Sequence, residues 1–175
     1  MRSTPSNKLA ALTSAAALTV AGLVYAPVST AATATTTLGV AAVVLQTCIA
    51  AATPVVFGNY TLTALDNTGV ITVTCTPDVL TYNVALGAGN GTGATTSARK
   101  LTSALDTSTL NYFLYRDSAR TQNWGSVQNT DTVASTAATT DLGTIKTFTV
   151  YGRLPASQTG TVGAYADIVQ VTVNY

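Results

Sequence analysis

The end of the chain limits its fold most strongly, because apolar and polar side chains alternate there with a period of two. Over residues 165–175, one side of an extended chain carries the apolar set Val169, Val171, Val173 and Tyr175. Such alternation is typical of a β-strand that buries one face and exposes the other. The chain therefore ends on a strand that needs a sheet.

A second segment near the beginning has the same pattern. Within residues 36–44, one side carries Leu38, Val40, Ala42 and Val44. The sequence leaves open which sheet this segment joins.

The residues before this segment predict a secretory signal peptide. Arg2 and Lys8 supply positive charge, residues 9–24 are apolar, and Ala34 ends an A-x-A cleavage pattern. The alternative is a membrane anchor, but the apolar run is shorter than the roughly 20 residues that span a bilayer. We expect a signal peptide at 1–34, a short segment at 35–47 and one domain at 48–175.

Charge and composition favour an exported β-protein. Without Arg2 and Lys8, the chain keeps six basic residues against seven Asp, so nucleic acid is not an expected partner. Charged residues make up only 9% of the chain, and Thr, Ser, Asn and Gln must keep it soluble. We expect export through the periplasm to the cell surface.

The chain contains two cysteines, Cys48 and Cys75. In an exported protein they predict one disulfide, which would stabilise the fold by roughly 3–4 kcal/mol. A metal or redox pair is the alternative, but the chain has no His and no CxxC spacing.

The residue types needed for common catalytic sites are missing. The chain has neither His nor Glu, so Ser-His-Asp and Cys-His sites cannot form, and we expect no enzyme, no metal and no cofactor. The glycine-rich run 87–93 lacks the Lys-Ser/Thr of a phosphate loop. Two Asp could still act as a glycosidase pair.

Four other residues have two interpretations. Arg99, Asp117 and Arg153 lie beside apolar or aromatic runs, where they could bind a ligand or anchor loops to the sandwich; we favour anchoring. Trp124 is interpreted as a core or rim aromatic in preference to a sugar platform.

Short alternating runs recur along the chain with turn residues between them. We expect strands within 55–65, 70–76, 79–86, 110–115, 146–151 and 165–175, a turn at 66–69, a loop at 87–93, and a long connection or weak edge at 126–141. This pattern predicts an all-β fold, a β-sandwich of about seven strands.

The order of several motifs resembles a known family. The motifs are Cys48, Phe57-Gly58-x-Tyr60, Gly69-x-Ile71-x-Val73-x-Cys75, Tyr82-x-Val84-x-Leu86, Arg99, Leu110-Asn-Tyr112, Asp117, Trp124-Gly125, Phe148-x-Val150, Arg153-x-Pro155, Gly163-x-Tyr165-x-Asp167 and Val171-Thr-Val-Asn-Tyr175. Together they resemble the spore coat protein U domain, the fold of pilins in archaic (Csu-type) chaperone–usher fimbriae.

The resemblance implies an incomplete immunoglobulin-like sandwich that lacks its last strand. A periplasmic chaperone would fill the gap first, beside the C-terminal strand that carries Val169, Val171, Val173 and Tyr175. At an outer-membrane usher, the N-terminal donor strand of the next subunit would replace it, which is β-strand addition.

In this chain, Leu38, Val40, Ala42 and Val44 would be the donor residues. An ordinary first strand in its own sheet is the alternative. The expected function is a pilus subunit that polymerises head to tail and serves adhesion and biofilm formation. A secreted coat or matrix protein that forms no long fibre is the alternative function.

Overall fold

The computed structural model describes residues 32–79, 81–136 and 145–175, where all regular secondary structure is β-strand. The strands are β1 (Cys48–Thr53), β2 (Leu65–Cys75), β3 (Thr81–Leu86), β4 (Arg99–Ser103), β5 (Thr109–Tyr115), β6 (Val133–Thr136), β7 (Ile145–Leu154), β8 (Tyr165–Ala166) and β9 (Val171–Asn174). Most of the predicted signal peptide lies outside these residues. Within them, no helix is long and apolar enough to cross a membrane.

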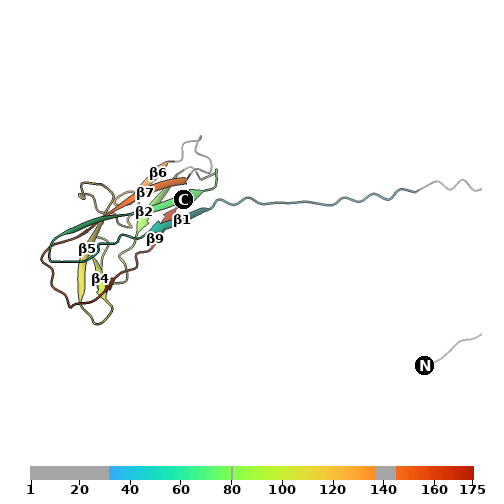
Figure 1. The fold of residues 1–175 in the computed structure, drawn as a ribbon. Helices are drawn as coiled ribbons and strands as arrows, with labels where there is room; N and C mark the ends of the chain where they lie inside the picture. The colour runs from blue at the N-terminus through green and yellow to red at the C-terminus, as the bar shows by residue number, and fades with distance from the viewer. Residues whose placement is uncertain (1–31, 80, 137–144) are drawn as a thin grey trace, which may run out of the picture. The chain divides into compact units, whose positions relative to one another are not determined.

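The strands form two sheets, and every pairing is antiparallel (Figure 1). The larger sheet has the order β1-β2-β7-β5-β4-β8, and the smaller has the order β6-β3-β9. Two antiparallel sheets around one core make an immunoglobulin-like sandwich. The predicted all-β sandwich is therefore confirmed.

The core lies between the two sheets and draws alternate residues from each. From the larger sheet come Ile71, Val73, Leu110, Tyr112, Leu114, Val150 and Leu154, and from the smaller come Tyr82, Val84 and Leu86. Trp124 is only 1% exposed and donates its indole N–H to the carbonyl of Val84 at 2.9 Å. It belongs to the core, as expected.

Two local predictions were wrong. Residues 66–69 are not a turn: they belong to β2, where Asp66 lies opposite Arg153 of β7. Gly69, which suggested a turn, is a glycine because the backbone at the end of β1 lies close to it. A Cβ at Gly69 would lie 2.7 Å from the carbonyl oxygen of Thr53. Residues 55–64 form no strand, although they alternate.

Strands β1 and β4 were not predicted, and the C-terminal run is interrupted. The run 165–175 divides into β8, which pairs with β4, and β9, which pairs with β3. The chain thus passes from one sheet to the other at residues 167–170. Strand β9 lies next to β1, as the ribbon in Figure 1 shows, although the two belong to different sheets.

Candidate functional site: an open edge of the sandwich

The inner side of β1 is open to solvent. Ala50 lies opposite Val73, and Ala52 lies opposite Ile71. Directly opposed residues of an antiparallel pair point to the same face. Val73 and Ile71 are 0% and 2% exposed, whereas both alanines are exposed. The core therefore ends at β2, and the core-facing side of β1 has no cover.

The apolar side of β9, the other strand at this edge, is also incompletely covered. Val173 lies opposite Val84, and Val171 lies opposite Leu86. The β3 residues are 0% and 2% exposed, while their β9 partners are only partly buried. The apolar side of β9 therefore stands at the border of the core.

Each of these strands has one free side. β1 pairs only with β2, and β9 pairs only with β3, among the strands in the described ranges. A free strand side presents unpaired N–H and C=O groups that can accept another strand. β1 and β9 are neighbours that belong to different sheets. We call the strip between their two free sides the groove; the partly covered apolar side chains of β9 and the exposed alanines of β1 face it.

A pocket of about 810 Å³ lies beyond the end of β1. One wall is formed by residues 55–62 and the other by residues 160–167. Leu101, Leu110 and Leu154 line the space between them. We call this part the wide end of the groove.

The first wall is held by a close approach and by two hydrogen bonds. A Cβ at Gly152 would lie 2.6 Å from Val55 Cγ1 and 3.0 Å from Phe57 Cζ, so the wall crosses β7 where a side chain is missing. The Tyr60 hydroxyl donates to the carbonyl of Pro155 at 2.7 Å and accepts from the N–H of Gln158 at 2.9 Å.

The second wall is held by Asp167. Its carboxylate accepts from the hydroxyl of Tyr112 at 2.7 Å and from the N–H of Asn90 at 2.7 Å. Burial raises the pKa of Tyr112, and the hydrogen bond to Asp167 raises it further. Tyr112 therefore stays protonated and keeps donating to the wall.

Arg99 lies beneath this wall and is fully buried. Its guanidinium donates to the carbonyls of Gly87, Thr96, Leu86 and Trp124 at 2.7–3.1 Å. Burial lowers the pKa of Arg99, and the charges of Asp167 and Asp131 act against this. The residue anchors the 87–96 loop to the core, which agrees with the anchoring interpretation.

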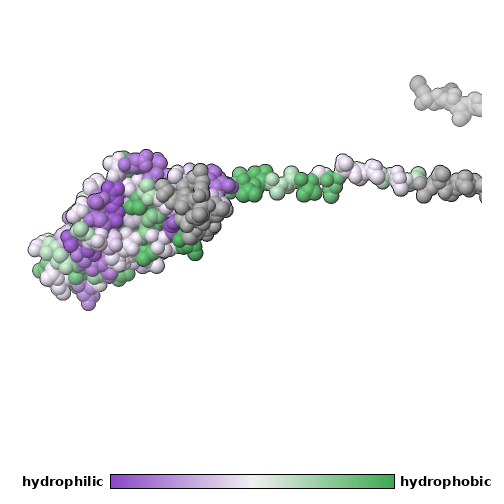
Figure 2. All heavy atoms as spheres, turned by 90° about the horizontal axis from the view of Figure 1, so that it is seen from above, coloured by the Kyte–Doolittle hydropathy of each residue, from purple (hydrophilic) through white to green (hydrophobic). Residues whose placement is uncertain are grey.

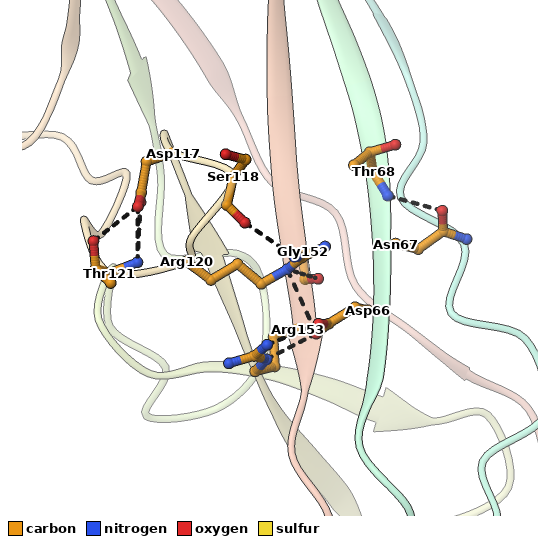
Figure 3. Close-up of polar contacts among 9 residues, drawn as sticks. All are labelled: Asp66, Asn67, Thr68, Asp117, Ser118, Arg120, Thr121, Gly152 and Arg153. Carbon is orange, nitrogen blue, oxygen red and sulfur yellow. Dashed lines mark hydrogen bonds and ion pairs between the residues drawn. The ribbon is translucent and has the colours of Figure 1, made fainter.

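Asp117 and Arg153 make structural contacts, but neither fastens a loop to the sandwich. Arg153 donates to Asp66, its cross-strand neighbour, at 2.7 and 2.8 Å, and Arg120 lies 3.5 Å from the same carboxylate. Figure 3 draws both contacts. The hydrogen bond from Arg153 lowers the pKa of Asp66. Asp117 accepts from the N–H and hydroxyl of Thr121 within its own loop. Neither residue lines the wide end.

The domain begins at a disulfide. Cys48 and Cys75 are bonded, with an S–S distance of 2.04 Å, and they lie opposite each other in β1 and β2. This prediction is confirmed. Just before the bridge, the Thr47 N–H donates to Thr76 Oγ1 at 3.1 Å, and the Gln46 side chain donates to the Asp78 carbonyl at 2.9 Å.

The segment before Gln46 forms no strand in this structure, and its apolar side chains are bare. Leu38, Val40 and Val44 are 88%, 89% and 81% exposed, and Ala42 is also exposed. In Figure 2 the segment that leaves the domain is green, the apolar end of the colour scale, over the part next to the domain and mostly pale further along. The proposed donor role of these four residues stays a prediction.

Sequence reasoning missed the residues that shape the wide end, such as Tyr60, Leu101 and Gln158. The alternation of residues 55–65 was visible, but it was interpreted as a strand. Leu101 lies in a short strand without strong alternation. Gln158 gave no signal, because its side chain bonds to the backbone of Asn111, which is 47 residues away in the sequence.

Three comparisons with known proteins bear on this architecture. The sequence model of the spore coat protein U domain matches residues 34–172. "Protein U" of Myxococcus xanthus is 31% identical over 125 residues, which are 70% of this chain and 67% of that protein.

A solved structure has a similar fold. It is a chaperone–tip adhesion subunit pre-assembly complex from the archaic chaperone–usher Csu pili of Acinetobacter baumannii, with a TM-score of 0.53 and 24% identity. The match covers 75% of this chain and 40% of that chain. At this identity, the likeness supports the fold.

Proposed function

The chain belongs to the spore coat protein U domain family, and from this membership and its open edge we propose that it is a structural subunit that polymerises by donor-strand exchange. Residues 36–44 of one copy insert between β1 and β9 of the next. A periplasmic chaperone fills the groove before assembly, and an outer-membrane usher is the site of exchange. The fibre serves adhesion and biofilm formation at the cell surface.

One observation carries the proposal: the two strands that border the groove both turn an uncovered apolar side inward. An inserted strand would cover the inner faces of Ala50, Ala52, Val171 and Val173 and pair with both free backbone sides. Burial of Leu38, Val40 and Val44 would contribute on the order of 5–8 kcal/mol. Their present exposure means that this free energy is still available.

The test uses two adjacent alanines of β1. Ala50→Asp places a carboxylate on the groove side, whereas Ala51→Asp places the same group on the opposite face of the strand. Both alanines are exposed, so neither change should unfold the domain. A synthetic peptide of residues 36–47 is titrated into the chaperone-released chain 48–175, and the rise in melting temperature is measured.

We expect the peptide to stabilise the parent and Ala51→Asp chains and to lose most of its effect on Ala50→Asp, because an unpaired charge in an apolar groove costs several kcal/mol. Val40→Asp in the peptide should abolish the effect, and Ala41→Asp should not. If the peptide leaves the parent chain unchanged, or if both alanine variants respond alike, the groove is not a donor-strand site.

A secreted coat protein without long fibres is the second candidate. The family description as a spore coat domain favours it. Electron microscopy of the native cell surface separates the two candidates, since only the first predicts extended fibres. Both use the same groove, so the peptide test applies to both.

A further inference from the structure

We propose that a second, external contact joins neighbouring subunits: Leu62 and Val162 on the rim of one groove close over Val43 and Leu45 of the inserted segment. This inference rests on the proposed donor-strand function. It concerns the outward side of the inserted strand, which the groove itself does not cover. The partner is a second copy of this chain.

The direction of the strands places the end of the donor segment at the wide end of the groove. β1 runs toward the wide end, because residues 55–62 follow it there, and β8 and β9 run away from it. All described strand pairs are antiparallel. β1 and β9 thus run in opposite directions, so an inserted strand is antiparallel to one and parallel to the other. If it is antiparallel to β9, its C-terminal end lies at the wide end.

The shape of the segment supports the same direction. Its first half is slim, with Gly39, Ala41 and Ala42, whereas Val43, Val44 and Leu45 are bulky and consecutive. β1 and β9 are neighbours, and the pocket of about 810 Å³ lies beyond β1. The bulky end of the segment therefore matches the wide end of the groove.

Alternation then decides which residues face outward. With Leu38, Val40, Ala42 and Val44 in the groove, the outward residues are Gly39, Ala41, Val43 and Leu45. Only Val43 and Leu45 among them are large, and they are 83% and 73% exposed in the free chain. The inserted strand would thus carry an apolar outer surface only at the wide end.

The rim of the wide end carries matching exposed apolar side chains. Leu62 lies on one wall and Val162 on the other, and they are 59% and 97% exposed. Leu62 is held in place with a positive φ of 62°, and its carbonyl accepts from the N–H of Ser157 at 2.9 Å. Apolar groups gathered at one rim indicate an interaction site.

The connection between the inserted strand and its own domain is very short. Leu45 directly precedes Gln46, which is tied to Asp78, and Thr47, which is tied to Thr76. Because a strand advances about 3.3 Å per residue, Leu45 stays within a few ångströms of its own domain. The rim of the receiving subunit and Leu45 of the donor are therefore brought together.

A cysteine pair tests this contact in assembled fibres. Leu45→Cys and Val162→Cys are combined in the full chain, assembled with the native chaperone and usher, and oxidised. The two native cysteines are bonded to each other, so only the new thiols can react. The control pair is Leu45→Cys with Val127→Cys, since Val127 is 56% exposed but does not line the wide end.

We expect the test pair to give a ladder of covalent multimers in boiled, unreduced samples, and the control pair to give monomers. Fibres that resist unheated SDS but yield no covalent ladder would overturn the rim contact and leave donor-strand exchange standing. Absence of fibres from the parent chain would instead overturn the proposed function, and this inference with it.

A second measurement does not depend on cysteines. Fibres of the double variant Leu62→Ser, Val162→Ser should still form, because β1 and β9, the strands with which the inserted strand pairs, are unchanged. They should release monomers in SDS at a temperature lower by on the order of 5 °C. The control double variant Val127→Ser, Ile145→Ser changes two exposed residues away from the rim and should leave the release temperature unchanged. Equal release temperatures for both double variants would refute the contact.

Discussion

β1 and β2 are partners in one ladder, yet their inner faces differ. Val73 and Ile71 of β2 are buried, while Ala50 and Ala52, directly opposite, are open to solvent. β2 lies beneath the smaller sheet, but β1 extends past it. The comparison teaches that strand pairing alone does not place a residue in a core; a second layer must cover it.

The comparison also explains why β1 consists mostly of alanine. A row of large side chains on the uncovered face would aggregate or collapse inward. Small side chains lower that cost and leave room for an incoming strand. The closed half of the domain has the opposite character, with Trp124, Arg99 and Tyr112 filling and fastening its interior.

The largest loss of stability is expected from a substitution in the closed half of the domain. Arg99→Met removes the donor for four buried or partly buried carbonyls, and it should lower the free energy of unfolding by about 4 kcal/mol. Urea unfolding measures this in a chain with residues 36–47 fused after Tyr175, which covers the groove. Lys100→Met, which removes one exposed hydrogen bond to Thr92, should cost under about 1 kcal/mol. Similar losses for both would contradict the role assigned to Arg99.

The next largest effect is expected when the disulfide between β1 and β2 is removed. Cys48→Ser with Cys75→Ser should cost roughly 3–4 kcal/mol, since the bond closes a long loop in the unfolded chain. Because it also fastens β1, the variant should gain more stability from a bound donor peptide than the parent does. A melting temperature unchanged by the double substitution would contradict this prediction.

A smaller effect on stability is expected when a methyl group is added at Gly152, where β7 contacts the wall of the groove. Gly152→Ala must displace Val55 and Phe57, at a cost of about 1–3 kcal/mol, and donor peptide binding should weaken in parallel. Gly87→Ala is the control, because a Cβ there would meet only ordinary contacts at 3.6 Å. Calorimetric titration with the 36–47 peptide measures the binding, and unchanged affinity would argue against a wall held by this approach.

The smallest effect is expected at the partly exposed pair of Asp66 and Arg153. Arg153 lowers the pKa of Asp66, so the pair stabilises the fold above the ordinary carboxyl pKa of about 3.9 and loses its effect as the pH falls through the lower folded value. Asp66→Asn should cost under about 1 kcal/mol at pH 7, because solvent screens the pair. The difference from the parent should vanish near pH 2; a constant difference down to that pH would point to packing instead.

Much of the closed half could be predicted from the sequence. The alternation of Ile71 and Val73, of Tyr82, Val84 and Leu86, and of the C-terminal valines identified strands and their buried faces. These residues are covered on one side only, which is the condition that produces alternation. The disulfide followed from export and from a single cysteine pair.

The open edge was harder to predict for a physical reason. β1 has no large apolar residue on its inner side, because nothing covers that side, so it carries no alternation to detect. Residues 55–64 alternate although they form no strand, because Val55 and Phe57 pack against β7 at Gly152. Asp66 and Asn67 resemble a turn, but long-range hydrogen bonds to Arg153 and to the Val56 carbonyl hold them extended.

The disulfide at the first residue of β1 also decides how the domain bears mechanical load. A pull on the segment before Cys48 reaches the fold at the residue that is bonded to Cys75. Without that bond, tension would act on the six residue pairs of the β1–β2 ladder alone. With it, the force also reaches β2, which has ten residue pairs with β7. The short strand β1 therefore does not bear the pull alone.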